Sequence, residues 1–295
     1  MKKPPIVTSI STAVFSLFLA GCQSVPAPEA ILPVPQEKQV NWQKMETYAF
    51  VHFGLNTFND REWGYGDSDP KTFNPARLDC EQWVQTFVNS GMKGVILTAK
   101  HHDGFCLWPT QLTEYCIRNT PYKDGKGDIV RELSDACKKY GIKFAVYLSP
   151  WDRHQANYGT PEYVDYFYKQ LNELLTNYGD VFEIWFDGAN GGDGWYGGAK
   201  DVRTIDRKTY YDYPRAYKMI DELQPQAVIF SDGGPGCRWV GNESGFAGAT
   251  NWSFLRAGEV YPGYPKYREL QYGHADGNQW VAAECDAVSY THLTL

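Results

Sequence analysis

The sequence lacks several features that would assign it to a common class of protein. It has no cluster of basic residues, and its net charge of −7 argues against a nucleic-acid partner. None of its seven cysteines forms a Cys-x-x-Cys unit, so the sequence shows no sign of a zinc knuckle. No internal repeat is visible. Intrinsic disorder is also excluded for most of the chain, because 43% of the residues are hydrophobic and can bury a sizeable core.

The first 22 residues are typical of a targeting segment. Lys2 and Lys3 form a positive region, an apolar stretch follows, and a Leu-Ala-Gly-Cys string ends at Cys22. The stretch is too short for a membrane-spanning helix. The string resembles a bacterial lipoprotein box, in which Cys22 becomes the lipidated N-terminus; an ordinary cleaved signal peptide is the alternative. Gln23, in place of an aspartate, favours export to the outer membrane, on its periplasmic or cell-surface face.

Residues 23–40 are rich in proline and predict an extended tether. Six cysteines follow Cys22. A disulfide between Cys106 and Cys116 would close a loop in an exported protein, but free buried thiols are the favoured interpretation. The six are Cys80, Cys106, Cys116, Cys137, Cys237 and Cys285.

From residue 41 onward, predicted strands and helices alternate, which indicates parallel βαβ units. An open doubly wound sheet would carry a glycine-rich phosphate loop after its first strand, and here residues 56–59 read Asn-Thr-Phe-Asn instead. We therefore predict an α/β protein with a TIM-like (β/α)8 barrel. The expected helices span 75–90, 129–140, 161–178 and 210–223. The expected strands span 48–55, 94–99, 143–148, 181–187, 227–231 and 280–284, with a further candidate near 248.

The run from Val181 to Gly188 is almost continuously apolar and ends in Asp187 followed by glycine. Such a run suits a strand buried on both faces in a parallel sheet. A carboxylate at the carboxyl end of a barrel strand lies where these folds place catalytic groups. Asp187 is therefore a candidate catalytic residue, and a helix N-cap is the alternative.

Polar and aromatic residues also follow the other predicted strands. Because the carboxyl ends of parallel strands meet at one face of a barrel, these side chains predict a single pocket. The high share of Trp and Tyr suits stacking on sugar rings. The residues at these strand ends include His52, Glu62, Trp63, His101, His102, Asp103, Tyr147, Ser149, Trp151, Asp232, Arg238 and Glu243.

Four motifs in this order resemble the α-L-fucosidases of glycoside hydrolase family 29. They are His-Phe-Gly from His52, Glu62-Trp63, the Thr-Ala-Lys-His-His-Asp-Gly-Phe run of residues 98–105, and Trp-Phe-Asp-Gly around Asp187. The resemblance covers residues 41–286. The Trp-Val-Gly-Asn-Glu run ending at Glu243 is similar to the subgroup that acts on α-1,3/1,4-linked fucose of Lewis-type glycans.

The resemblance implies a retaining mechanism in which Asp187 is the nucleophile and Glu243 is the acid/base, without a cofactor. Two carboxylates about 5–5.5 Å apart can divide these roles when the second is protonated at the start. The resemblance further implies that several residues bind the fucose hydroxyls, and that Trp252 lies against the ring or its methyl group. The hydroxyl-binding residues would be His52, Glu62, Trp63, His101, His102 and Tyr147.

Several alternatives stay open at the level of sequence. Glu284 also ends a predicted strand and is a rival for the acid/base role. Arg238 would either orient the acid/base or pair with a surface acid. Ligation of a metal ion by His52, His101, His102 and Asp187 would make the protein a metal-dependent hydrolase. A non-catalytic sugar-binding lipoprotein is the third class of function.

Family members continue into a β-sandwich domain, and the sequence leads us to expect a barrel truncated before its last strand. Residues 287–295 resemble a non-native tail. An unpaired strand edge would favour aggregation, so we expect this chain to be poorly soluble or weakly active. The expected partners are fucosylated glycans and, through the lipid anchor, a membrane; the sequence does not determine the oligomeric state.

Overall fold

The computed structural model describes residues 27–198 and 200–287, which divide between two units, 1–34 and 35–295. The described residues of the first unit, 27–34, form no helix or strand. The predicted targeting segment with Cys22 lies outside the described residues, as does the predicted tail from residue 288 onward. No helix in the described part of the chain is long and apolar enough to cross a membrane.

The second unit is built on a sheet of seven strands in the order β1-β2-β3-β4-β7-β8-β11, and every neighbouring pair is parallel. Tyr48, one residue before β1, donates a hydrogen bond to Glu284 at the end of β11. This bond joins residues from the two edges of the sheet, so the sheet curls as a barrel wall does. The strands are β1 (Ala49–Val51), β2 (Gly94–Lys100), β3 (Lys143–Leu148), β4 (Glu183–Trp185), β7 (Val228–Ser231), β8 (Cys237–Trp239) and β11 (Ala282–Glu284).

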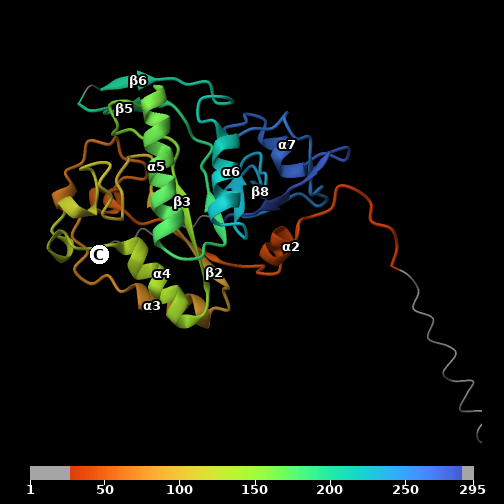
Figure 1. Ribbon diagram of the computed structural model, residues 1–295, viewed down its shortest axis with the longest axis horizontal. Coiled ribbons are helices and arrows are strands. Elements are labelled where there is room, and N and C mark those ends of the chain that lie inside the picture. Colours follow the sequence, from red (N-terminus) through yellow and green to blue (C-terminus); the bar gives the residue numbers. More distant parts are fainter. Residues whose placement is uncertain (1–26, 199, 288–295) are drawn as a thin grey trace, which may run out of the picture. The chain divides into compact units, whose positions relative to one another are not determined.

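Helices fill most connections between these strands, and α4 packs against both β2 and β3 (Figure 1). Local signals set their bounds. Asp128 accepts a hydrogen bond from the Arg131 backbone at 2.9 Å and begins α4, and Gly141 ends it in the left-handed conformation. The helices are α2 (Glu37–Gln43), α3 (Cys80–Asn89), α4 (Ile129–Tyr140), α5 (Pro161–Asn177), α6 (Tyr213–Leu223) and α7 (Tyr267–Tyr272).

Two short hairpins and four 3₁₀ helices lie in loops that follow strands of the sheet. Two antiparallel hairpins pair β5 (Gly192–Gly194) with β6 (Asp201–Arg203) and β9 (Phe254–Leu255) with β10 (Gln279–Trp280). Four 3₁₀ helices occur in the loops after β1 and β2. They are η1 (Leu55–Asn59), η2 (Pro70–Thr72), η3 (Ile117–Asn119) and η4 (Tyr122–Gly125).

Strands β2, β4 and β7 are buried on both faces, and successive residues of a strand serve different cores. In β2, Val95 and Leu97 join the large core shared with the helices, whereas Ile96 points to the barrel interior with Tyr147 and Trp185. This two-sided burial explains why the strands are nearly continuous apolar runs in the sequence.

The curled parallel sheet agrees with the predicted α/β barrel, and the predicted bounds of β3 and α4 are confirmed. Strand β8 is absent from the predicted strands, and the candidate strand near residue 248 is wrong. The predicted helices at 75–90 and 210–223 begin too early, since α3 starts at Cys80 and α6 at Tyr213.

Helix α2 begins at Glu37, inside the range predicted as a tether. Its Gln39 side chain donates a hydrogen bond to the Gly236 backbone oxygen at 2.7 Å, and Trp42 is buried in the barrel interior. The six cysteines after Cys22 are free, and five of them are buried, with Cys285 the exposed one. Cys106 and Cys116 lie on paired backbone segments without being joined.

Candidate active site

The predicted site residues come from loops at the carboxyl ends of neighbouring parallel strands. His52 follows β1, His101 and His102 follow β2, and Asp187 lies two residues beyond β4. Because these strands run parallel, their loops share one edge of the sheet. Contacts between the side chains show which of them meet.

Two hydrogen bonds orient the Asp187 carboxylate. Phe186 before it is buried, while the Asp187 side chain is 25% exposed. The Tyr147 hydroxyl donates a hydrogen bond to its Oδ2 at 3.0 Å, and the Ala189 backbone donates to its Oδ1 at 2.7 Å. No helix begins here, so the N-cap alternative is wrong. The carboxylate is fixed in orientation and accessible.

The two histidines after β2 lie on the same side of the chain. Neighbouring residues of a regular strand would face opposite ways, but the register shifts between Thr98 and Lys100, and His101 and His102 follow beyond the strand end. Their ring centroids are 4.1 Å apart. The irregular strand end thus presents both imidazoles to the site.

His102 links Asp187 to β3. Its Nδ1 lies 2.7 Å from Ser149 Oγ, and its Nε2 lies 3.7 Å from Asp187 Oδ2. Burial lowers the pKa of His102 to about 4, although the charge of Asp187 acts in the opposite direction. Burial and the neighbouring His102 also lower the pKa of His101 well below its usual range. Both rings are therefore neutral at pH 7, and each has one donor and one acceptor.

Aromatic rings line the site around these histidines. The His52 ring stands edge-on to His101 with centroids 4.4 Å apart, and Tyr147 stacks on His101 at 5.7 Å. Trp63 is 42% exposed and meets His102 edge-on at 4.9 Å. The Trp151 ring contacts both Trp63 and His102, with its centroid 5.9 Å from that of Trp63. These rings form one cluster of contacts that combines apolar ring faces with polar nitrogens.

Glu243 follows β8 and is exposed, four residues beyond the end of the strand. Partial desolvation raises its pKa, and the charges of Asp187 and Glu62 raise it further. Glu243 is therefore close enough to both carboxylates for their charges to favour its protonated form. Glu62 is itself exposed, and its charge also acts on His52.

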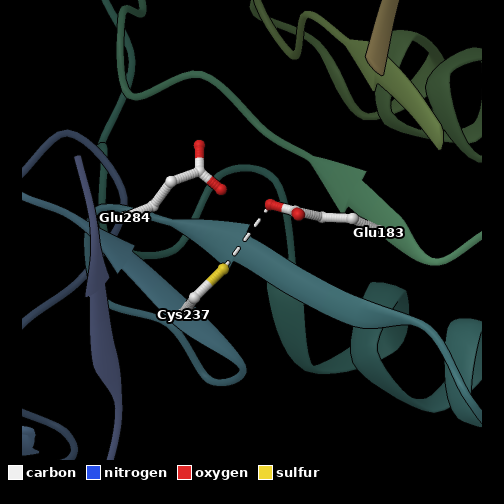
Figure 2. Close-up of side chains that lie close together, drawn as sticks. All are labelled: Glu183, Cys237 and Glu284. Atoms are coloured by element: carbon white, nitrogen blue, oxygen red, sulfur yellow. Dashed lines mark hydrogen bonds between the residues drawn. The ribbon is translucent and has the colours of Figure 1, made fainter. Parts of the chain in front are cut away.

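Glu284, the rival of Glu243, lies elsewhere. It is 8% exposed in the barrel interior, where Trp185 Nε1 donates to its Oε1 at 2.8 Å and the Tyr48 hydroxyl donates to its Oε2. Both carboxylate oxygens are thus occupied. The structure places Glu284 in a buried cluster with Glu183 and Cys237 (Figure 2).

That cluster is, within the described residues, the one group of three or more His, Cys, Asp or Glu side chains close enough to hold a metal ion. Trp42 donates to Glu183 at 2.9 Å and the Cys237 thiol donates to it at 3.5 Å. Burial and the neighbouring Glu284 raise the pKa of Glu183 well above its usual range, so Glu183 favours its protonated form. The proposed ligands His52, His101, His102 and Asp187 form no such group in the described part of the chain.

Neither sequence-based interpretation of Arg238 is correct. Arg238 is fully buried, and its guanidinium donates to the backbone oxygens of Leu270 at 2.7 Å, Trp252 at 2.8 Å and Val281. It therefore ties β8 to the β9–β10 hairpin. Trp252 is 46% exposed, and its ring meets Phe254. Among the described residues, no ring contact joins Trp252 to the histidines.

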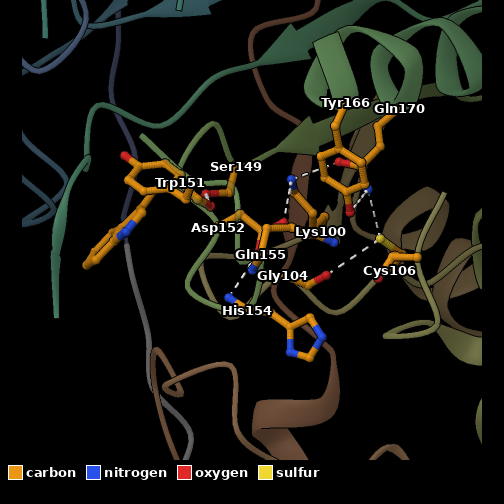
Figure 3. A network of polar contacts seen from close by, with 12 residues as sticks. Lys100, Gly104, Cys106, Ser149, Trp151, Asp152, His154, Gln155, Tyr166 and Gln170 are labelled. Carbon is orange, nitrogen blue, oxygen red and sulfur yellow. Dashed lines mark hydrogen bonds and ion pairs between the residues drawn. The ribbon is translucent and has the colours of Figure 1, made fainter. Parts of the chain in front are cut away.

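A buried network of polar contacts, which the sequence did not reveal, lies at the ends of β2 and β3 (Figure 3). Lys100 is fully buried, 3.3 Å from Asp152 and 2.8 Å from Gln170. Asp152 also accepts hydrogen bonds from the backbones of His154 and Gln155 at 3.0 Å. The network joins the loop after β2 to the loop after β3. A lysine at a strand end is the only local sign of it, since its partner lies 52 residues away.

At two glycines of the sequence motifs, Gly104 and Gly188, there is no room for a side chain. A Cβ at Gly104, whose φ is +87°, would lie 2.3 Å from Asp152 Oδ1. A Cβ at Gly188 would lie 2.1 Å from Asp232 Oδ2. Asp232 is buried beside the site, and burial together with the charge of Asp187 raises its pKa to about 7.

Comparison with known proteins gives a consistent result. A family model described as alpha-L-fucosidase matches residues 17–247. Alpha-L-fucosidase 1 of Arabidopsis thaliana is 46% identical over 267 residues, which cover 88% of this chain and 49% of the plant protein. The solved structure of a glycoside hydrolase 29 family member from an unknown rumen bacterium is 57% identical, with a TM-score of 0.83 over 86% of this chain and 46% of that one.

A family 29 fucosidase from Ruminococcus gnavus, solved in complex with fucose, is 33% identical with a TM-score of 0.74. That match covers 89% of this chain and 57% of the bacterial one. The chain thus spans about half the length of the relatives it matches.

Proposed function

The chain belongs to the α-L-fucosidase family, glycoside hydrolase family 29, and we propose that it is a retaining exo-α-L-fucosidase. The observation that carries the proposal is the setting of Asp187. It is an accessible carboxylate at the end of a buried parallel strand, oriented by Tyr147 and Ala189 and flanked by neutral histidines. This arrangement supplies a nucleophile and the hydroxyl-binding groups that a sugar needs.

In the proposed reaction, Asp187 attacks the anomeric carbon of fucose and forms a covalent glycosyl-enzyme. Glu243 protonates the departing glycosidic oxygen and then removes a proton from the water that releases fucose, so the configuration is retained. The raised pKa of Glu243 supports the first half of this role, because a general acid must begin protonated.

The fucose hydroxyls are proposed to bind His52, Glu62, Trp63, His101, His102 and Tyr147. Neutral imidazoles suit hydroxyls because each ring can donate and accept a hydrogen bond at once. Trp252 would lie against the sugar ring or its methyl group. The contact of the Trp63 ring with His102 supports the place of Trp63 among the hydroxyl-binding residues. The Trp-Val-Gly-Asn-Glu run ending at Glu243 supports α-1,3/1,4-linked fucose of Lewis-type glycans as the substrate.

The test is to incubate the chain with Lewis-type trisaccharides and with an aryl α-L-fucoside, each with and without a chelator. We expect fucose release from the trisaccharides, slow aryl turnover and no effect of the chelator. A 2-fluoro fucoside should trap the intermediate, and mass spectrometry should find the label on the peptide that contains Asp187. A label on another residue, or an inverted product by NMR, would contradict the mechanism.

A non-catalytic sugar-binding protein is the second candidate. Fucose binding without any release from either substrate would favour it. A metal-dependent hydrolase would instead lose its activity in the chelator arm of the same assay.

We also propose that the protein is exported and anchored to the outer membrane through lipid on Cys22. The Lys2-Lys3 pair and the Leu-Ala-Gly-Cys string support this proposal. Metabolic labelling with palmitate in a bacterial host should label the protein, and Cys22→Ser should abolish the label. Equal labelling of the variant would refute the anchor.

A further inference from the structure

Three buried polar atoms without a hydrogen-bond partner belong to residues that line one cavity. They are Asn56 Oδ1, His101 Nδ1 and Asp103 Oδ2. The cavity has a volume of about 30 Å³ and lies between the loop after β1 and the loop after β2. A buried polar atom without a partner costs stability, so three such atoms on residues that line one cavity favour a polar occupant.

The chemistry of the three atoms specifies the occupant. Asn56 is 4% exposed and Asp103 is 2% exposed, and their two oxygens accept hydrogen bonds, the carboxylate when it is ionised. His101 Nδ1 can donate or accept. Burial and its neighbours lower the pKa of His101 well below its usual range, so the ring carries a single proton. A water molecule needs about 10–15 Å³ and two to four polar partners, and this cavity provides both.

We propose that this cavity is an internal water site that fixes the tautomer of His101. One water donates its two hydrogens to Asn56 Oδ1 and Asp103 Oδ2 and accepts a hydrogen bond from His101 Nδ1–H. Asn56 and Asp103 are then positioning residues that act on His101 through the water.

The tautomer matters for ligand binding, and this consequence rests on the proposed function. With the proton on Nδ1, the other ring nitrogen, Nε2, accepts a hydrogen bond from a sugar hydroxyl. The ring beside it, His102, makes its own hydrogen bond to Ser149 from Nδ1 and turns Nε2 toward Asp187. The two adjacent histidines are thus fixed by different partners and offer separate sites to the sugar.

The first test needs no activity. A crystal structure of the 295-residue chain at high resolution should show a water within hydrogen-bond distance of the three atoms. Nitrogen-15 NMR of the imidazoles, with His101 assigned through a His101→Gln variant, should report the Nδ1–H tautomer above the pKa of Asp103. A dry cavity, a metal ion in it, or the Nε2–H tautomer would overturn the proposal.

Variants separate positioning from mere packing. Asn56→Leu keeps the size of the side chain but removes the acceptor, so we expect the Nδ1–H signal to weaken and L-fucose to bind about tenfold more weakly. Asp135→Asn, an exposed change on α4, is the control and should alter neither. An unchanged tautomer in folded Asn56→Leu would overturn the positioning role. If Asn56→Leu does not fold, the crystal structure and the imidazole NMR of the unaltered chain still test the water site. Failure of the unaltered chain to bind fucose would refute the proposed function and leave the water site standing.

Discussion

Substitution of Glu243 and of Glu284 should have opposite consequences, because Glu243 is exposed whereas Glu284 is buried in the barrel interior. Removing a general acid costs about 10²–10⁴-fold in rate. Glu243→Ala should show that loss on Lewis-type trisaccharides, and less on an aryl fucoside, whose leaving group needs less protonation. Azide, as an external nucleophile, should restore part of the rate. Since Glu243 is exposed, the variant should keep its stability within about 0.5 kcal/mol.

Glu284→Ala should instead lower stability. It leaves the Tyr48 hydroxyl and Trp185 Nε1 buried without an acceptor, at about 1–3 kcal/mol each, and it opens a cavity in the interior. The two unpaired groups alone amount to about 2–6 kcal/mol, which corresponds to a fall in Tm of about 4–24 °C at about 2–4 °C per kcal/mol. The folded fraction should retain most of its rate at low temperature.

The assay combines initial rates on the trisaccharide, with and without azide, and a thermal unfolding curve for each variant. The reasoning would be refuted by near-normal rates in Glu243→Ala together with an inactive but stable Glu284→Ala. That pair of results would move the acid/base role to Glu284.

Three further predictions follow from buried contacts. Tyr147→Phe removes the 3.0 Å hydrogen bond to Asp187, so we expect kcat to fall about tenfold with little change in Tm; an unchanged kcat would contradict this. Lys100→Met leaves the buried Asp152 without its cationic partner and should cost about 3–5 kcal/mol in urea unfolding. Lys139→Met, at the exposed pair with Glu81, is the control and should cost far less. Asp232 keeps its proton up to about pH 7 in the folded protein but only to about pH 4 when unfolded, so its contribution to stability is lost as pH rises between these values. Asp232→Asn should therefore gain stability relative to the unaltered chain by up to about 1.4 kcal/mol per pH unit over that range, and a pH-independent difference in urea unfolding would contradict the raised pKa of Asp232.

The sequence by itself predicted the parts of the fold that local signals control. Strand β3 and helix α4 have the predicted bounds, because a two-sided apolar run, an Asp cap and a terminal glycine act within a few residues of each other. The strand that leads to Asp187 was predicted for the same reason, since a buried parallel strand is apolar on both faces. Strand β8 was missed because its three residues follow a glycine-rich turn and include an arginine that is buried only through distant backbone oxygens.

Tertiary structure decided which strand-end residues meet and what each one does. Glu243 follows a strand and Glu284 ends one, yet Glu243 is exposed and feels the charge of Asp187, while Glu284 is held in the interior by Tyr48 and Trp185. The pairing of Lys100 with Asp152 could not be predicted from the sequence, because 52 residues separate the two. The position and partners of each side chain depend on where its strand ends and on which face of the strand points inward. Contacts between segments many residues apart set both of these features. The residue types and the order of the motifs in the sequence therefore pointed to the family and to the candidate site residues. Burial, charge and hydrogen bonding in the folded chain distinguished the carboxyl groups from one another.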